Sequence, residues 1–448
     1  MNDKVSKKKG ITRRGFMKGA AMVAAASGLI TGAPVIRKAN TQPQQKKYPC
    51  MKITSVEIYL FENALLNTPD GTGTKDKPII CRINTNEGIS GLGEAGISYG
   101  IGATSAFGMV KDLAEIIIGM DPTNTEKIWD IMQKNTFWGK SVGIMFSAGM
   151  SAIDIALWDI KSKSLGVPLY KMLGGKTRDS LRCYAAQLQF GWGREWTPLA
   201  LPEEYAECAI KAVEEGYDCI KINPIMFNSD DKMEGDFTKI LSRSQIESCY
   251  NRLAAVRDAI GPDIDIIVEL HSMTDATSAV QLGKAIEDIG IYYYEEPVAP
   301  LNPDLMKEVR ENVNFPIASG ERIYTRWGYR PFLEMKALDI IQPDFCNCGG
   351  ISEGKKICDM AHVYDISVQA HVAGSPVSQA VALHVETAIP NFIIHEHHVN
   401  YLNPNVQEMC NYNYQPVKGR YYVPDLPGIG LELSEAVIKR AVAKTIIK

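Results

Sequence analysis

The second half of the chain repeats one pattern, in which a short apolar segment ends at an ionisable residue and a helical segment follows. The separations between successive ionisable residues are 26, 26, 23, 27 and 25 residues. Random placement of charged loop residues would rarely produce such even spacing, so the pattern indicates six successive strand–helix units. The six residues are Glu269, Glu295, Glu321, Asp344, His371 and Glu396.

Eight apolar segments with strand character lie within residues 181–400, separated by helical segments. Alternation at this count predicts an α/β fold whose parallel strands close into a TIM-type barrel. An open doubly wound sheet is the competing fold, but no Gly-rich phosphate turn follows an early strand. The carboxyl ends of barrel strands open onto one face, so the six ionisable residues should converge there. The segments are LRCYAAQ, DCIKIN, DIDIIVEL, GIYYYEE, FPIASGE, LDIIQPD, ISVQA and NFIIHEH.

Residues 51–180 are organised differently, with strand patterns first and helical patterns after them. KITSVEIYLF alternates like a strand, and PIICRINTNEGISGLGEAG indicates two strands joined by a turn at residues 86–88. Helical spacing follows over residues 106–118, 125–135 and 146–165. This order predicts a separate α+β domain, which leaves residues 181–400 as the barrel and catalytic domain.

Length, composition and charge limit the classes of function. A chain of 448 residues is too long for one ordinary compact core and suggests a large domain with a smaller one. Its 45% hydrophobic and 22% charged residues fit a soluble globular protein. The net charge is −4, and the body of the chain has no Lys/Arg-rich block, which argues against nucleic acid as a partner.

The first 40 residues form a separate segment. Arg13 and Arg14 directly precede an apolar, Ala-rich run, which is the pattern of a twin-arginine export signal. A membrane anchor is the alternative, but the Gly, Ala and Pro residues of the run are weak for a spanning helix. Residues 1–40 hold nine Lys/Arg and one Asp, a charge of +8, so their removal leaves −4 − 8 = −12. We expect an acidic periplasmic protein without a stable membrane anchor.

Three of the strand-end residues, Glu269, Glu295 and Glu321, come from successive strands and would form an oxygen-rich site. Such a site suits Mg²⁺, whereas zinc would call for more His or Cys ligands. The cation could hold a substrate carboxylate and stabilise the enediolate that forms when the α-proton leaves. His371 lies on the strand next to Asp344, so we expect this carboxylate to orient the imidazole and support its charged form.

The segment VELHS ends the third of the eight apolar segments. On a strand, residues i and i+2 point to the same side, so Glu269 and His271 should project together while Leu270 faces the opposite side. The alternative interpretation is a polar strand end that only leads into a loop.

Several motifs make the chain similar to the mandelate racemase/muconate lactonizing enzyme branch of the enolase superfamily, and most similar to its galactonate-type acid-sugar dehydratases. The resemblance runs from about residue 52 to the end. It implies a modified (β/α)7β barrel under the α+β capping domain, which residues 401–448 would complete. The motifs are SAIDIALWDIKSKSLGVPLYKMLGG (151–175), YYYEEPVAP (292–300), ASGERIYTR (318–326), IIQPDFCNCGGISEGKKI (340–357) and PGIGLELSE (427–435).

The resemblance also implies roles for individual residues. Asp344 and His371 match the Asp–His dyad that removes the α-proton, and His271 matches the acid that helps the β-hydroxyl leave. Glu396 matches a residue that hydrogen-bonds the substrate carboxylate and the enediolate. Enolase-superfamily sites as a class combine a Lys or His base with one or two Mg²⁺ ions. The three residues that match the Mg²⁺ ligands are Glu269, Glu295 and Glu321.

Two departures from the family pattern affect the expected chemistry. The family usually has Asp at position 269, and the extra methylene of Glu269 moves the carboxylate by about 1.5 Å, one C–C bond. Racemases of the branch carry Lys-x-Lys on the second strand, where this chain has Lys221 and Asn223. Asn223 cannot serve as a second base and is a candidate substrate contact. Lys221 is either a substrate contact or a charged partner of the carboxylates.

Three further residues are candidates for lining the substrate pocket. Tyr99 and Trp138 come from the capping domain, although either could instead be a core residue. Of the three histidines beside Glu396, His397 is the best candidate to face the site, and His395 is expected to pack away from it. Substrate specificity is expected to lie in the capping-domain loops, including residues 63–77 and 98–104.

The expected function is Mg²⁺-dependent dehydration of an aldonate-type sugar acid to a 2-keto-3-deoxy acid, by a homo-oligomer that binds this small molecule. A racemase, epimerase or cycloisomerase would share the proton-abstraction half of the reaction. A non-catalytic sugar-acid binding protein is the rival from another class, but binding alone requires no Asp–His dyad. The sequence leaves open which sugar acid is used.

Overall fold

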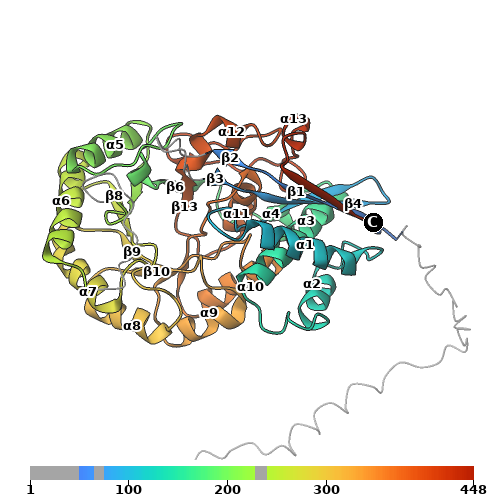
Figure 1. Cartoon of the computed structure of the whole chain (residues 1–448), viewed down its shortest axis with the longest axis horizontal. Coiled ribbons are helices and arrows are strands. Elements are labelled where there is room, and N and C mark those ends of the chain that lie inside the picture. The colour runs from blue at the N-terminus through green and yellow to red at the C-terminus, as the bar shows by residue number, and fades with distance from the viewer. Residues whose placement is uncertain (1–49, 65–74, 228–239) are drawn as a thin grey trace, which may run out of the picture. The chain divides into compact units, whose positions relative to one another are not determined.

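The computed structural model describes residues 50–64, 75–227 and 240–448 (Figure 1). The expected export signal at residues 1–40 lies outside the described residues, as does most of the expected specificity loop at 63–77. The described residues belong to one compact unit. None of the helices within the described ranges is long and apolar enough to cross a membrane.

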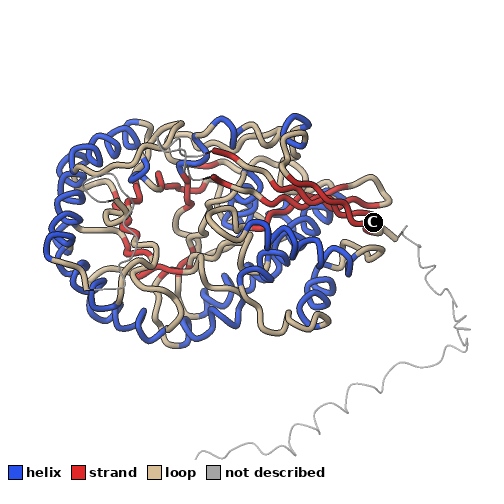
Figure 2. The backbone as a smooth tube through the Cα atoms, in the orientation of Figure 1, coloured by secondary structure: helices blue, strands red, loops and turns tan. Residues whose placement is uncertain are grey.

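Eight parallel strands form the barrel, which confirms the predicted fold. Neighbouring strands pair in chain order, and β13 pairs with β6. The remaining junction is closed by a parallel bridge between Val368 and Phe392, just before β13. Figure 2 shows the strands as a ring inside a layer of helices. The strands are β6 (Leu181–Ala186), β7 (Cys219–Ile222), β8 (Asp265–Glu269), β9 (Tyr293–Glu295), β10 (Ile317–Ser319), β11 (Ile340–Ile341), β12 (Ser367–Val368) and β13 (His395–His398).

The helices between the strands begin at residues that suit helix starts. Ser242 and Gln245 form a capping box before α6, and Asp275 accepts a hydrogen bond from the Ser278 N–H at the start of α7. Figure 1 shows these helices following one another around the outside of the barrel. They are α5 (Pro202–Glu214), α6 (Arg243–Ile260), α7 (Ala276–Ala285), α8 (Pro303–Asn312), α9 (Thr325–Glu334), α10 (Gly350–Val363) and α11 (Pro376–Ala388).

The capping domain pairs an antiparallel sheet with three helices. The sheet order is β15-β1-β4-β5, so the last strand of the chain lies beside the first. Gly93 of β5 allows close packing of α3, because a Cβ at this position would lie 1.9 Å from the Ala152 carbonyl oxygen. The elements are β1 (Ile53–Leu60), β4 (Ile79–Thr85), β5 (Ser90–Ala95), β15 (Ala443–Ile447), α1 (Ala103–Ile117), α2 (Thr125–Lys134) and α3 (Ile144–Ser164).

Short elements complete the described part. Two hydrogen-bonded strands, β2 and β3, flank the undescribed residues 65–74, and β14 pairs antiparallel with β6. These elements are β2 (Asn63–Ala64), β3 (Lys75–Asp76), β14 (Arg420–Tyr421), α4 (Leu169–Met172), α12 (Pro404–Gln407) and α13 (Glu435–Ile438), with single 3₁₀ turns η1 (Leu188–Phe190), η2 (Glu287–Ile289) and η3 (Val399–Leu402).

Side chains that point into the barrel fill its interior below the strand ends. The tyrosines Tyr184 and Tyr293 pack there with smaller residues that include Cys219, Ile267 and Ala318. All five are fully buried. The interior of the barrel is therefore a packed core, and the carboxyl ends of the strands lie above it, toward the capping domain.

Two carboxylates of the capping domain hold the N-termini of two barrel helices. Asp154 of α3 accepts hydrogen bonds from the Ser352 N–H at 2.8 Å and the Ser352 hydroxyl at 2.6 Å, at the start of α10. Glu94 of β5 accepts from the Ser375 N–H and hydroxyl and from the Ser378 N–H, at the start of α11. Buried carboxylates at helix N-termini therefore join the two domains.

Replacing Asp154 by Ala should lower the free energy of unfolding by about 2–3 kcal/mol. The change removes the helix cap and leaves the buried Ser352 donors unpaired. Urea unfolding followed by circular dichroism measures the effect. Asp130→Ala is the matched control, because the half-exposed Asp130 of α2 forms a surface ion pair with Lys134, so its loss should cost less than about 0.5 kcal/mol. Equal losses in the two variants would contradict this role for Asp154.

Candidate active site

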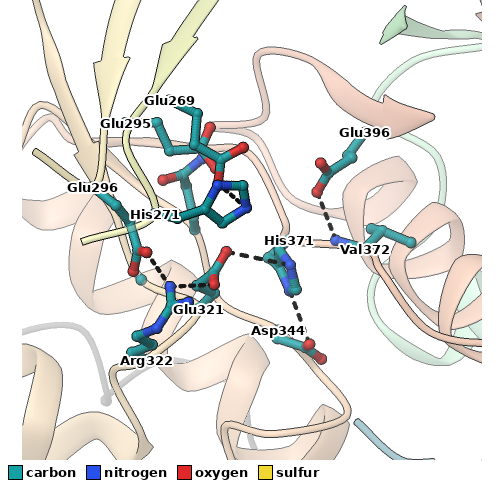
Figure 3. A network of polar contacts seen from close by, with 12 residues as sticks. Glu269, His271, Glu295, Glu296, Glu321, Arg322, Asp344, His371, Val372 and Glu396 are labelled. Atoms are coloured by element: carbon teal, nitrogen blue, oxygen red, sulfur yellow. Dashed lines mark hydrogen bonds and ion pairs between the residues drawn. The ribbon is translucent and has the colours of Figure 1, made fainter. Parts of the chain in front are cut away.

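The six strand-end residues surround the carboxyl ends of the barrel strands, as the spacing predicted (Figure 3). A cavity of about 310 Å³ opens beside them. Its wall includes His271, Glu321 and His371 from the barrel and Ile97 and Ile144 from the capping domain. Both domains therefore contribute to one candidate substrate site.

Glu269, Glu295 and Glu321 form a compact carboxylate cluster. Each offers one ligand atom, and the three atoms lie within 4.8 Å of one another. Glu295 Oε2 is buried and has no hydrogen-bond partner. Burial raises the pKa of Glu295, and although Lys221 opposes this, the nearby carboxylates of Glu269 and Glu396 add to the rise. Such a concentration of buried negative charge with an unsatisfied oxygen fits a hard divalent cation.

Lys221 lies among the carboxylates rather than on the cavity wall. Its Nζ is 3.2 Å from Glu269 Oε2, 2.9 Å from Glu295 Oε1 and 2.8 Å from Glu396 Oε1. The side chain is fully buried. Of the two roles predicted for Lys221, these contacts match the charged partner of the carboxylates, and its contact with a substrate stays a prediction. Lys221 is the charged partner that offsets part of their repulsion.

His271 contacts Glu269 as predicted, but extended alternation is not the reason. Strand β8 ends at Glu269, and the backbone turns at His271 and Ser272 with φ angles of 48° and 58°. His271 Nε2 then lies 2.9 Å from Glu269 Oε1. This left-handed turn is uncommon outside glycine and brings the imidazole back over the carboxylate.

Asn223 positions His271 and is absent from the cavity wall, which corrects its predicted role as a substrate contact. Its side-chain amide lies 2.7 Å from His271 Nδ1, where the amide nitrogen donates and the ring nitrogen accepts. The ring proton of a neutral His271 is then on Nε2. The polar end of β7 therefore fixes the tautomer of the residue that follows β8.

Asp344 and His371 are paired as the sequence predicted. His371 Nδ1 lies 3.0 Å from Asp344 Oδ2, and His371 Nε2 lies 3.3 Å from Glu321 Oε2. The Cys346 N–H and the Asn347 amide donate to Asp344 and hold it in place. Figure 3 shows His371 between Asp344 and Glu321.

The electrostatics of His371 depend on the carboxylates around it. Burial alone would lower the pKa of His371, but Glu321 and Asp344 outweigh it and raise the pKa to about 10. A divalent cation held by Glu321 would offset this negative charge and bring the pKa of His371 back toward neutrality. Cation binding would thus favour the neutral imidazole that a base requires.

Glu396 is buried behind His371 and does not line the cavity. Its Oε2 accepts a hydrogen bond from the Val372 N–H at 2.9 Å, directly after His371. Burial would raise the pKa of Glu396, but the charges of Lys221 and His371 lower it overall. Glu396 therefore holds the segment that carries His371, and its contact with the substrate stays a prediction.

The prediction that His397 faces the site is wrong, and His398 takes that place. Side chains alternate along β13, so Glu396 and His398 point into the barrel while His395 and His397 point outward. His397 Nδ1 accepts from the Tyr421 hydroxyl at 2.5 Å, away from the cavity. His398 lines the cavity instead. The expectation that His395 packs away from the site agrees with its contact to Glu386.

Lowering the pH should destabilise the fold through its buried neutral histidines. Burial lowers the pKa of His384 and of His397 to about 3, from 6.5. Each pKa is lower in the folded state than in the unfolded state. The stabilisation that these histidines give to the folded state is therefore complete above pH 6.5 and is lost as the pH falls toward 3. At pH 5 each residue should cost about 2 kcal/mol of unfolding free energy.

Urea unfolding at pH 7.5 and pH 5.0 measures this loss. His397→Phe should reduce the difference between the two pH values by about 2 kcal/mol, whatever its effect on stability at pH 7.5. His362→Gln is the control, because His362 is exposed on α10 and its replacement should leave the difference unchanged. An unchanged difference in His397→Phe would contradict the prediction.

Of the two capping-domain residues predicted to line the substrate pocket, one lies on the cavity wall and the other does not. Tyr99 lines the cavity, and its hydroxyl accepts a hydrogen bond from the Asn400 side chain. Trp138 is 78% exposed, contacts Phe137 edge to face, and is absent from the cavity wall. Its predicted role is corrected, because the segment after α2 carries it outward.

Sequence reasoning missed several residues of the cavity wall. Gln187 follows β6 with φ 67° and donates to Glu269 Oε2 at 2.9 Å. It ends the first barrel strand, so the strand-end rule used for the other six could have found it. Arg322 pairs with Glu321 and with Glu296, which makes Glu296 a partner of Arg322. The remaining missed wall residues are Gly96, Ile97, Ile144, Phe190, Trp196, Met226, Tyr324, Asn347, Ala373 and His398.

Comparisons with known proteins give consistent relatives. A family model for the mandelate racemase / muconate lactonizing enzyme N-terminal domain matches residues 56–174, and an enolase C-terminal domain-like model matches residues 204–437. The D-xylonate dehydratase of Haloferax volcanii is 32% identical, over 79% of this chain and 83% of that protein. The D-galactarolactone cycloisomerase of Agrobacterium fabrum is 31% identical, over 86% of this chain and 97% of that protein. A crystal structure of an enolase superfamily member from Salmonella Typhimurium is 55% identical, covers 89% of this chain and all of that one, and has a TM-score of 0.84.

Proposed function

The chain belongs to the mandelate racemase/muconate lactonizing enzyme family of the enolase superfamily, and we propose that it dehydrates an aldonate-type sugar acid to a 2-keto-3-deoxy acid. The observation that carries the proposal is the arrangement of His371 and His271 on one cavity beside the carboxylate cluster. Their strands, β12 and β8, are four positions apart around the barrel. One histidine can then take a proton from one side while the other gives a proton from the opposite side.

Mg²⁺ is the proposed cofactor, and Glu269, Glu295 and Glu321 would hold it. When bound, the cation would supply positive charge to the substrate carboxylate and make its α-proton more acidic. The donor set supports this choice, because all three ligands are carboxylates and none is Cys or His. Lys221 would remain beside the cluster as a second positive charge.

The proton transfers can be assigned to the two histidines. His371, oriented by Asp344, removes the α-proton as a neutral base, and the C–H electrons form the enediolate. His271, in its protonated imidazolium form, then gives its Nε2 proton to the β-hydroxyl, which leaves as water, and the ring becomes neutral. The resulting enol takes a proton at C3 and loses the proton of its C2 hydroxyl, which gives the 2-keto acid. His371 returns its proton to solvent, and His271 takes one up. Positioned acid–base groups of this kind contribute about 10²–10⁴ in rate each.

Glu396 requires a modified role in this proposal. An ionised carboxylate only accepts hydrogen bonds, so Glu396 can donate to a substrate carboxylate only when it carries a proton. The approach of a second negative charge would raise the pKa of Glu396 and favour that proton. Without such a change, Glu396 contributes by holding the Val372 N–H and the segment of His371.

A cycloisomerase acting on a sugar-acid lactone is the second candidate. It is favoured by the D-galactarolactone cycloisomerase of Agrobacterium fabrum, which matches along nearly its whole length. Such an enzyme would use the same α-proton removal but would not release water. A non-catalytic binding protein is disfavoured, because binding requires neither a paired Asp344–His371 nor a second histidine opposite it.

A library of acid sugars and their lactones, incubated with the protein and Mg²⁺ and followed by mass spectrometry, tests the proposal. Loss of one water from an aldonate is the expected result. Conversion without a mass change would support the cycloisomerase or an epimerase, and binding without conversion would support a binding protein.

We also propose that the protein is exported to the periplasm by the twin-arginine route. Cell fractionation tests this proposal, because the double variant Arg13→Lys, Arg14→Lys should no longer be exported.

A further inference from the structure

His398 is a cavity-wall residue that the proposed reaction leaves unused. It lies on β13, two residues beyond Glu396, and faces the same cavity as His271 and His371. Only 5% of the surface of His398 is exposed to solvent. Its ring nitrogen Nδ1 accepts a hydrogen bond from the Asn400 N–H. The other ring nitrogen, Nε2, has no hydrogen-bond partner among the described residues.

The backbone fixes the protonation state of this ring. The Asn400 N–H donates to His398 Nδ1 at 3.1 Å. Because a backbone N–H can only donate, Nδ1 must be unprotonated, and the ring proton is on Nε2. If Nδ1 also carried a proton, the Nδ1–H of His398 would face the N–H of Asn400, and neither group could accept a hydrogen bond. His398 is therefore a neutral N–H donor rather than a cation or a general base.

Both domains hold the ring in place. The ring centroid of Tyr99, from the capping domain, is 6.3 Å from that of His398, and the ring of Trp196 is 6.2 Å away on the barrel side. The Asn400 side chain donates to the Tyr99 hydroxyl, so the residue that fixes the tautomer is itself tied to the capping domain. A polar group held this firmly is suited to discriminate between ligands.

The position along β13 sets which part of a substrate His398 can reach. Glu396 Oε1 lies 2.8 Å from Lys221 Nζ at the carboxylate cluster, and His398 lies two residues farther along β13, toward the capping domain. At about 3.3 Å per residue, this step is about 6–7 Å. A sugar acid whose carboxylate is held at the glutamate cluster would extend several carbons before it reaches His398.

We infer that His398 donates a hydrogen bond from Nε2 to a substrate oxygen beyond the reacting carbons, and so selects acids with a hydroxyl at that position. This inference rests on the proposed dehydration of a sugar acid. His398 would be a specificity residue that makes no proton transfer. A site built to hydrogen-bond a hydroxyl rejects the analogue that lacks it far more strongly than an apolar pocket does.

The test compares the best aldonate found in the library with its analogues deoxygenated singly at each carbon beyond C3. In the parent protein, one analogue should lose about 10-fold or more in kcat/KM, since a buried donor would be left unpaired. In His398→Phe, which keeps a ring but removes the donor, that same loss should shrink to within about threefold. His398→Gln, which restores an N–H donor, should recover part of it.

His397→Phe is the matched control, because it changes the same residue type on the same strand but on the outward face. Its ratio between the aldonate and each analogue should equal that of the parent. Equal ratios in His398→Phe and in the parent would overturn the inference while leaving the dehydratase proposal intact. If the parent protein dehydrates no acid sugar, the proposed function fails, and this inference fails with it.

A second measurement is made on the parent protein and does not depend on turnover. In the parent protein labelled with ¹⁵N-histidine, His398 should show a protonated Nε2 and an unprotonated Nδ1 from pH 6 to pH 8, with His398→Gln used for assignment by difference. A protonated Nδ1 would overturn the inference directly.

Discussion

Glu295→Gln should reduce turnover by at least about 10³-fold while the protein remains folded. Glu295 Oε2 is a buried carboxylate oxygen with no partner, and Oε1 is already paired with Lys221 at 2.9 Å. A neutral amide is a much poorer ligand for Mg²⁺, and a catalytic cation is worth several kcal/mol of barrier. At 1.36 kcal/mol for each tenfold change in rate, the loss reaches three orders of magnitude.

Isothermal titration calorimetry with Mg²⁺ provides a readout independent of turnover. The parent should bind one cation per site, and Glu295→Gln should bind it at least about tenfold more weakly. Glu353→Gln is the matched control, because Glu353 is a buried carboxylate outside the site that pairs with Arg326. It should lose stability but retain cation affinity. Exhaustive chelation should abolish turnover, and added Mg²⁺ should restore it. Full activity of the metal-depleted protein would contradict the proposed dependence on Mg²⁺.

The barrel could be predicted because its signal is repeated and local. Each strand–helix unit carries its own apolar segment and its own ionisable end, so errors at one boundary leave the spacing of the others unchanged. The eight predicted segments match β6 to β13. Strand ends were less predictable: β8 stops at Glu269, and a left-handed turn, rather than extended alternation, directs His271.

The pairings within the site were predictable only in part. Asp344 and His371 follow adjacent strands, β11 and β12, so sequence order implied their contact. The bridging position of Lys221 depends on three distances across the barrel that no local pattern encodes. The choice between His397 and His398 could have been made from the sequence, because alternation from Glu396 along one strand places residue 398 on the same face.

The substrate-binding residues were the hardest to predict because the capping domain supplies them through loops. Trp138 and Tyr99 have similar aromatic character in the sequence, yet only Tyr99 lines the cavity. Their difference comes from how the segments after β5 and α2 leave the domain core. Loop geometry of this kind has no periodic signal, whereas helices and strands do.

The two histidines should separate the two halves of the reaction. His371→Asn should stop both product formation and exchange of the α-proton with D₂O, because the substituted amide can still bond Asp344 but cannot take a proton at neutral pH. His271→Asn should block loss of the hydroxyl by about 10²–10⁴-fold and still allow exchange of the α-proton. Asn at position 271 keeps a group that can accept from Asn223, so the site should retain its shape.

Proton NMR of the substrate in D₂O measures exchange, and mass spectrometry of the same sample measures loss of water. The reason for the separation is that enediolate formation requires the carboxylate cluster and the Asp344–His371 pair, while elimination also requires a proton for a poor leaving group. Because β8 and β12 are four strands apart, the two rings reach the substrate from different sides. Exchange lost in His271→Asn but retained in His371→Asn would reverse the roles, and the substrate would then bind with its opposite face toward Asp344.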